Sequence, residues 1–313
     1  MKKILTSLGL SLASAAALAA QPLLTPQELA PLLKNAQLRV IDIRDAQGFG
    51  ANHIPGAVNA PYARWRGPAS NPGELPPQDR LIALVQQLGL SEQSHAVVVS
   101  NGKDASDFGA AARVYWTLKS LGLKELSIAN GGMQAWEEAR LPLSNNPLPV
   151  APSSYAPRFD ARWLATRDEV AQHVQKGDAT LIDARPDAFY LGQAQVPAAK
   201  LAGTLPGAVQ QDFNQWFPRG SARFIAPADA RQVAASVPRD AGKAAVAFCN
   251  TGHWAATEWF ALSEVAGQPD VKLYAGSMVD WTQAPEALPV HNAPSRATQL
   301  TRSAQQWIKR TFD

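Results

Sequence analysis

The single cysteine of this 313-residue sequence, Cys249, lies where an apolar run, residues 244–248, meets a polar segment and then a helical pattern. The segment after it is Asn250-Thr251-Gly252-His253-Trp254-Ala255. Free N–H groups and the dipole at a helix start stabilise an anion, and there the pKa of a thiol falls below its usual value of about 8.5. Gly252 would let the loop curl so that successive amides face the sulfur. We therefore expect Cys249 to be a nucleophile in a cradle of amides from Asn250 to Ala255.

Each of these residues also has a plainer interpretation. A lone cysteine is most often a small buried hydrophobe, but the Gly and the polar residues beside Cys249 favour reactivity. For His253 the alternatives are a solvated loop residue or a group that shapes the pocket, and Trp254 is either a hydrophobic plug or part of that pocket. Asp183 and Arg185 end another strand of the same half, which a parallel sheet could bring beside the loop. A structural ion pair or a cap is the alternative for these two residues.

Composition excludes several other kinds of site. One cysteine forbids an intramolecular disulfide and any multi-cysteine zinc or iron–sulfur site. The five histidines are scattered, without a pair at metal-ligand spacing, and no dinucleotide-binding or phosphate-binding glycine loop is present. The 29 Lys and Arg against 26 Asp and Glu give a net charge of +3, too small and too dispersed for nucleic-acid binding. We expect no metal, no cofactor and no nucleic-acid partner.

Four sequence patterns occur twice in the same order, which indicates a tandem duplication. The repeated segments are residues 40–44 and 181–185, 54–58 and 205–209, 96–100 and 244–248, and 130–136 and 275–281. In each copy short apolar runs alternate with helical patterns. This alternation predicts an α/β fold in which each copy forms a parallel sheet with helices on both faces.

The duplication, together with the composition of the linker and of the two terminal segments, predicts the domain organisation. We expect a signal peptide at 1–20, an N-terminal domain at 21–144, a proline-rich linker at 145–158, a C-terminal domain at 159–291 and a helical tail at 292–313. Lys2 and Lys3 precede an uncharged stretch rich in Leu and Ala that ends at Ala20, as secretory signal peptides do. Cleavage would release a near-neutral periplasmic protein without stable membrane insertion; a retained anchor is the alternative. The tail is expected to dock on the body, or else to contact a membrane surface or a partner.

Taken together, these patterns resemble the rhodanese family of two-domain sulfurtransferases. The resemblance rests on the Asp-x-Arg strand ends, the Pro-Gly-Ala segments, the cysteine loop with glycine three residues on, and the Gly-(Gly/Ser)-Met-x-x-Trp segments. It implies two tandem rhodanese-like domains, of which the first is inactive, and Asn101 stands near where that copy would carry its cysteine. The implied catalytic residue is Cys249, and the implied substrate-binding residues are Asn250, Thr251, Gly252, His253, Trp254, Ala255, Asp183 and Arg185.

The resemblance also implies a reaction. Sulfane sulfur would pass from a small-molecule donor through a Cys249 persulfide to cyanide, a thiol or a protein acceptor, without a cofactor. The donor stays open between thiosulfate and 3-mercaptopyruvate, because Asn250 and Thr251 stand where thiosulfate-using members carry basic residues. Phe189 likewise occupies the position of a substrate-binding arginine.

Two arginines of the first domain are further candidates for the site. Arg64 and Arg66 could bring positive charge across the cleft between the domains, with ordinary surface arginines as the alternative.

Two other functions compete with sulfur transfer. A cysteine phosphatase would need an arginine six residues beyond the cysteine, where this sequence has Ala255 and Ala256. A non-enzymatic periplasmic persulfide carrier or partner-binding module is the second rival.

Overall fold

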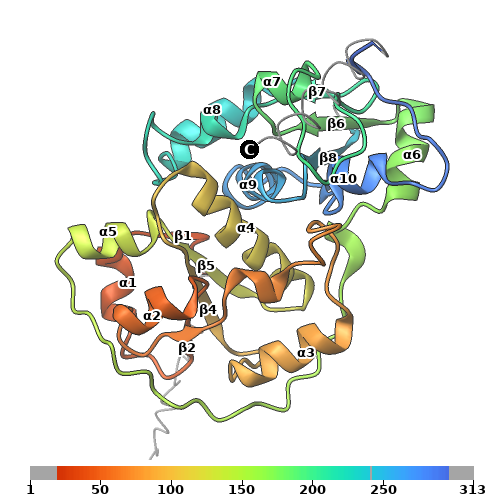
Figure 1. Ribbon diagram of the computed structural model, residues 1–313. Helices are drawn as coiled ribbons and strands as arrows, with labels where there is room; N and C mark the ends of the chain where they lie inside the picture. Colours follow the sequence, from red (N-terminus) through yellow and green to blue (C-terminus); the bar gives the residue numbers. More distant parts are fainter. Residues whose placement is uncertain (1–19, 240–241, 296–313) are drawn as a thin grey trace, which may run out of the picture.

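The two copies fold into two parallel sheets, one in each half of the chain (Figure 1). The computed structural model describes residues 20–239 and 242–295. Each pairing between neighbouring strands is parallel, which confirms the predicted class of two tandem α/β units. The first sheet has the order β1-β5-β4-β2-β3 and the second the order β7-β6-β8-β9. The strands are β1 (Leu23–Leu24), β2 (Leu38–Asp42), β3 (Val58–Asn59), β4 (His95–Val99), β5 (Glu125–Ala129), β6 (Ala179–Asp183), β7 (Val209–Gln210), β8 (Ala244–Phe248) and β9 (Val271–Leu273).

Helices connect the strands in both halves (Figure 1). The first half contains α1 (Pro26–Leu32), α2 (Ala46–Ala51), the 3₁₀ turn η1 (Tyr62–Trp65), α3 (Gln78–Gln87), α4 (Ala105–Ser120) and α5 (Gly132–Glu138). The second half contains η2 (Ala161–Trp163), α6 (Arg167–Lys176), α7 (Asp187–Tyr190), η3 (Phe213–Trp216), α8 (Pro227–Ser236), α9 (Trp254–Trp259), η4 (Phe260–Val265) and α10 (Ser277–Thr282). The segment η4 is a π-helix that continues α9.

Both faces of each sheet are covered, because alternate residues of a strand point to opposite sides. In β4, Val97 and Val99 pack with apolar residues of α1, α2 and α5, whereas Val98 packs with α3 and α4. In β8, Val246 packs with α6 and α10, and Ala247 packs with α8 and α9. The central strands β4 and β8 are therefore nearly continuous in apolar residues, as expected for a parallel sheet.

A single apolar core joins the two halves. Helices α4 and α9 lie against each other between the sheets (Figure 1). Phe108 of α4 meets Phe217, Phe224 and Phe260 of the second half, with ring centroids 5.4, 5.2 and 5.5 Å apart. These rings belong to one cluster of buried side chains that includes residues of both sheets. This shared core decides which first-domain residues reach the loop that follows β8.

The first-domain counterpart of Cys249 is Ser100, and the sequence-based choice of Asn101 was one residue off. Strand β4 ends at Val99, one residue earlier than the repeat indicated. The backbone oxygens of Ser100 and Cys249 accept equivalent hydrogen bonds, from the N–H groups of Met133 and Met278 at 2.9 and 3.1 Å. A hydroxyl thus stands in the first domain where the second has its thiol.

Two expected segments lie almost wholly outside the described residues: the signal peptide at 1–20 and the tail at 292–313. From residue 145 to residue 160, a range that contains the predicted linker, the chain forms no helix or strand. The predicted domain boundaries stay predictions. Within residues 20–239 and 242–295, none of the helices combines the length and the apolar character that a membrane span requires.

Candidate functional site

Cys249 is the first residue after β8, and it is buried, with 1% of its surface exposed. Its backbone N–H donates to Ser277 Oγ at 3.0 Å, and its carbonyl oxygen accepts from the N–H of Met278. The N–H of Gly252 donates to the same Ser277 Oγ at 3.0 Å. The start of α10 therefore holds the first and the fourth residue of the cysteine loop.

The remaining amides of this loop have no protein acceptor. Within the described residues, no hydrogen bond uses the backbone N–H of Asn250, Thr251, His253, Trp254 or Ala255. Unpaired N–H groups are rare in protein interiors, and consecutive free amides at a strand-to-helix turn bind anions. The loop thus offers what a thiolate, a persulfide or a bound oxyanion requires.

Gly252 allows the first domain to approach this loop closely. Its φ of 65° lies in the left-handed region, which glycine adopts at little cost. A Cβ at this position would collide with the carbonyl oxygen of Ala275 and with the guanidinium of Arg113. Arg113 belongs to α4, and its Nη1 lies 3.4 Å from the carbonyl oxygen of Gly252. The close contact between Arg113 and the loop therefore depends on glycine at 252.

Arg113 brings a buried positive charge to the thiol. Its Nη2 donates to the carbonyl oxygen of Gly73 at 2.9 Å, while its Nε has no partner among the residues that the structure describes. In the described part of the chain Arg113 forms no ion pair with a carboxylate. Burial, with a smaller effect of Arg66, lowers the pKa of Arg113 to about 9, so it stays charged at neutral pH. A buried cation without a carboxylate requires another anion, and Cys249 is close enough to act on its charge.

Asp183 and Arg185 form a buried ion pair that reaches the cysteine loop. Arg185 Nε donates to Asp183 Oδ1 at 2.8 Å, and Arg185 Nη2 donates to Asp183 Oδ2. The hydroxyl of Thr204 also donates to Asp183 Oδ2, at 2.6 Å. Arg185 Nη1 donates to Asn250 Oδ1 at 3.1 Å. The pair therefore positions the side chain of Asn250, and a substrate-binding role of its own stays a prediction.

His253 connects the loop to the first domain. Its Nε2 lies 2.7 Å from the carbonyl oxygen of Ser106, so Nε2 carries the proton. Nδ1 then accepts from the hydroxyl of Tyr62 at 2.9 Å, and Arg66 Nη1 donates to that hydroxyl oxygen at 2.6 Å. Burial, together with repulsion by Arg66, lowers the pKa of His253 to about 4. The ring is therefore neutral at physiological pH and acts as a hydrogen-bonding bridge between the domains.

Trp254 closes the second-domain side of the loop. Its ring stacks on Phe213 at a centroid distance of 4.8 Å and meets Phe189 edge-on at 5.8 Å. Its Nε1 donates to the hydroxyl oxygen of Ser106 at 2.9 Å. The Trp254 ring thus packs on the aromatic rings of the second domain while its Nε1 bonds to the first domain, and a role in the substrate pocket stays a prediction.

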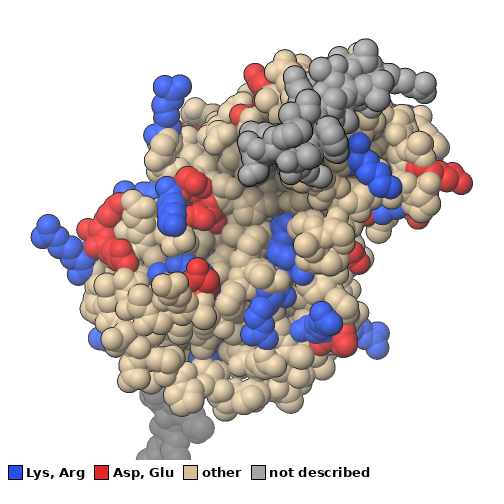
Figure 2. Space-filling model, viewed as in Figure 1, with Lys and Arg blue, Asp and Glu red and all other residues tan. Residues whose placement is uncertain are grey.

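Arg64, in η1, and Arg66, just after it, differ in exposure and in their partners. Arg64 is exposed and bonds to Gln87, whereas Arg66 is partly buried beside Tyr62. On the face shown in Figure 2, basic and acidic side chains are interspersed, without a field of one sign. The positive charges that the first domain brings to the loop are those of single side chains, Arg113 and Arg66, both of which act on His253.

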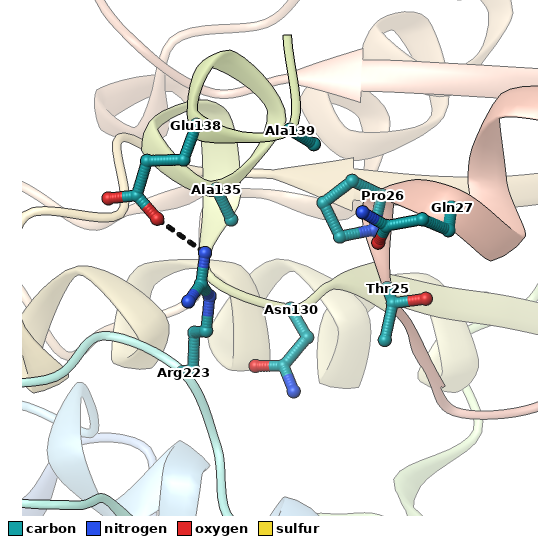
Figure 3. Close-up of a pocket in the computed structure, with 8 residues that line it drawn as sticks. All are labelled: Thr25, Pro26, Gln27, Asn130, Ala135, Glu138, Ala139 and Arg223. Atoms are coloured by element: carbon teal, nitrogen blue, oxygen red, sulfur yellow. Dashed lines mark hydrogen bonds and ion pairs between the residues drawn. The ribbon is translucent and has the colours of Figure 1, made fainter. Parts of the chain in front are cut away.

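A separate cavity of about 340 Å³ lies between the domains but lacks the chemistry of the cysteine loop (Figure 3). Arg223, the basic residue in its lining, is paired with Glu138. The other lining residues are Thr25, Pro26, Gln27, Asn130, Ala135 and Ala139. None of these side chains is a strong nucleophile at neutral pH, so Cys249 remains the candidate centre.

Sequence reasoning missed the first-domain residues that surround the loop, namely Tyr62, Ser106 and Arg113, and it also missed Ser277. Two of these carry a local signal. Arg113 is the lone charge between Ala110 and Leu118 in an apolar helix, and Ser277 replaces the second glycine of the repeated Gly-Gly-Met pattern. Tyr62 and Ser106 carry none, because the packing of the two domains brings them to the loop.

Comparisons with known proteins agree with this geometry. The sequence profile described as "Rhodanese-like domain" matches residues 25–139 and 166–284. A probable 3-mercaptopyruvate sulfurtransferase of Pseudomonas aeruginosa is 32% identical over 280 residues, covering 84% of this chain and 95% of that protein. A thiosulfate sulfurtransferase of the same organism is 31% identical, covering 83% and 94%. The crystal structure of SseA, a 3-mercaptopyruvate sulfurtransferase of Escherichia coli, shares the fold with a TM-score of 0.72 at 22% identity, over 82% of this chain and 99% of SseA.

Proposed function

This chain belongs to the rhodanese family, with a rhodanese-like domain in each half, and from this premise we propose that Cys249 carries the sulfur that the protein transfers. The chain is a sulfurtransferase, as its relatives along nearly their whole length are. The observation that supports Cys249 most directly is the set of backbone amides beside it, those of Asn250, Thr251 and residues 253–255, which have no acceptor among the described residues. The thiolate and the persulfide are both anions, so the same amides serve the resting and the loaded enzyme.

The reaction proceeds in two displacements. The thiolate attacks the outer sulfur of thiosulfate, a new S–S bond forms, and the old S–S bond breaks with its electron pair leaving on sulfite. An acceptor such as cyanide or a thiol then attacks the outer sulfur of the persulfide, and the thiolate of Cys249 is regenerated. With 3-mercaptopyruvate the bond that breaks is C–S, and the enolate of pyruvate leaves and takes up a proton. Neither route needs a metal or an organic cofactor.

Positive charge from the first domain supports an anionic donor. The loop itself has no Lys or Arg between Cys249 and Ala255, and Phe189 contributes an aromatic ring. Arg113 is buried and pairs with no carboxylate in residues 20–239 and 242–295, and Arg66 lies beyond the Tyr62 hydroxyl. Both thiosulfate and 3-mercaptopyruvate are anions that these charges would attract. We take thiosulfate as the first donor to test.

Intact mass spectrometry of the protein after incubation with thiosulfate tests the assignment. Because the sequence has one cysteine, a gain of one sulfur atom can be assigned to Cys249 without digestion. We expect the gain in the wild type and none in Cys249→Ser, and we expect cyanide to remove it. A wild type that gains no sulfur from either donor, or a Cys249→Ser variant with full sulfite release, contradicts the proposal. Repeated turnover separates an enzyme from a carrier that is loaded once.

Export to the periplasm is part of the proposal. It is supported by Lys2 and Lys3 before an uncharged stretch that ends at Ala20. The mass of the protein recovered from a periplasmic fraction should correspond to a chain that begins after Ala19 or Ala20. Full-length protein found in the cytoplasmic fraction contradicts export.

A further inference from the structure

Ser277 has a left-handed backbone conformation, which residues other than glycine rarely adopt. Its φ is 55°, and it is fully buried. The residue at the same place in the first domain is Gly132, with a φ of 58°. Each precedes a methionine whose N–H donates to the carbonyl oxygen of the residue that follows β4 or β8. The fold thus calls for glycine here, and the second domain has a strained serine instead.

The hydroxyl of Ser277 is fully used in holding the cysteine loop. It accepts from the N–H groups of Cys249 and Gly252, both at 3.0 Å, and donates to the carbonyl oxygen of Tyr274 at 2.8 Å. These bonds fix both ends of the turn, and the amides between and after them stay free for an anion.

The first domain shows what happens without this side chain. A Cβ on Gly132 would lie 2.5 Å from the carbonyl oxygen of Ser100 and 2.8 Å from the nitrogen of Gly102. The first loop therefore closes onto the glycine and leaves no room for a hydroxyl. In the second domain the serine occupies that space and keeps its loop apart from the backbone of α10.

We propose that Ser277 is a positioning residue that sets the amide cradle of Cys249, and that its backbone strain is retained for this purpose. This inference depends on the proposed sulfur transfer only where it concerns the turnover of a sulfur donor. The reactivity of the Cys249 thiol toward a small alkylating agent reports on the cradle without any sulfur donor. Failure of sulfur transfer and failure of this proposal can therefore be told apart.

Two variants separate positioning from stability. Ser277→Gly removes the hydroxyl and the strain, whereas Ser277→Ala removes the hydroxyl and keeps the strain. We expect Ser277→Ala to unfold at a lower urea concentration than Ser277→Gly. Both variants should nevertheless show about the same loss, at least tenfold, in the rate at which iodoacetamide alkylates Cys249 at pH 7. Arg140→Gly is the matched control, because Arg140 is exposed, has a φ of 54° and lies in the other domain.

The outcome that overturns the proposal is a Ser277→Gly variant that folds and alkylates at the wild-type rate. An alkylation rate that simply follows stability, lower in Ser277→Ala than in Ser277→Gly, also overturns it, since it would give Ser277 a purely structural role. Arg140→Gly should keep the wild-type rate. A tenfold loss in both serine variants supports the proposal even if the wild type transfers no sulfur from thiosulfate.

Discussion

Glu258 makes the stability of the second domain depend on pH. It lies on α9, the helix that follows the cysteine loop, and it is fully buried. Trp216 Nε1 donates to Glu258 Oε2 at 2.7 Å, while Glu258 Oε1 has no partner in the described part of the chain. Burial raises the pKa of Glu258 from 4.5 to about 8. A neutral carboxylic acid is therefore the form that this core accepts.

The sign and size of the effect follow from proton linkage. Between about pH 4.5 and pH 8 the folded protein binds a proton at Glu258 that the unfolded chain has lost. Within this window the contribution of Glu258 to the unfolding free energy falls as pH rises, by about 1.4 kcal/mol per pH unit. The full contribution is present below pH 4.5, and at pH 7 about 3 kcal/mol of it is lost.

Glu258→Gln removes this titration and keeps the shape of the side chain. We expect the variant to be about 3 kcal/mol more stable than wild type at pH 7. The advantage should shrink toward zero near pH 4.5. Urea unfolding of both proteins at pH 5, 6, 7 and 8 gives the difference directly, and Glu286→Gln, at an exposed position, is the control, expected to change stability by less than about 0.5 kcal/mol. A difference between Glu258→Gln and wild type that stays constant from pH 5 to pH 8 refutes the reasoning.

Three further predictions concern the site. Arg113→Met removes the buried cation, and iodoacetamide should alkylate Cys249 at least about tenfold more slowly at pH 7, because the reagent reacts with the anionic sulfur and the variant lacks the positive charge that attracts it; an unchanged rate contradicts this. With its pKa at about 4, His253 is neutral above pH 5, so sulfur transfer in wild type and in His253→Asn should have the same pH profile between pH 5.5 and pH 8. A step that disappears in the variant would show that the ring titrates. Arg185→Met leaves the Asp183 carboxylate buried without its cation, which should cost about 3–5 kcal/mol in urea unfolding, and a loss below about 1 kcal/mol would contradict the ion pair.

The features that could be predicted from the sequence are those that depend on local residue patterns and on the internal repeat. The duplicated apolar runs identify the strands, and the place of Cys249 one residue beyond such a run identifies the loop. The position predicted for the first-domain counterpart of Cys249, Asn101, is one residue too late, because a sequence pattern locates the end of a strand less well than its centre. Tyr62, Ser106 and Arg113 could not be predicted, since the docking of α4 against α9 brings them to the loop. No spacing rule links residues that meet only through a core shared by two domains.

The two domains use equivalent elements in opposite ways. Helices α4 and α9 follow the equivalent strands β4 and β8, and they meet at the interface. In the first domain the loop after β4 is closed on Gly132, and the carboxylate of Asp104 caps the start of α4. The first turn of α4 instead supports the second-domain loop, because Ser106 bonds to both His253 and Trp254. About two turns further along the same helix, Arg113 brings a positive charge to the loop. A first domain without a thiol is therefore part of the site, since the loop of Cys249 is complete only when α4 is packed against it.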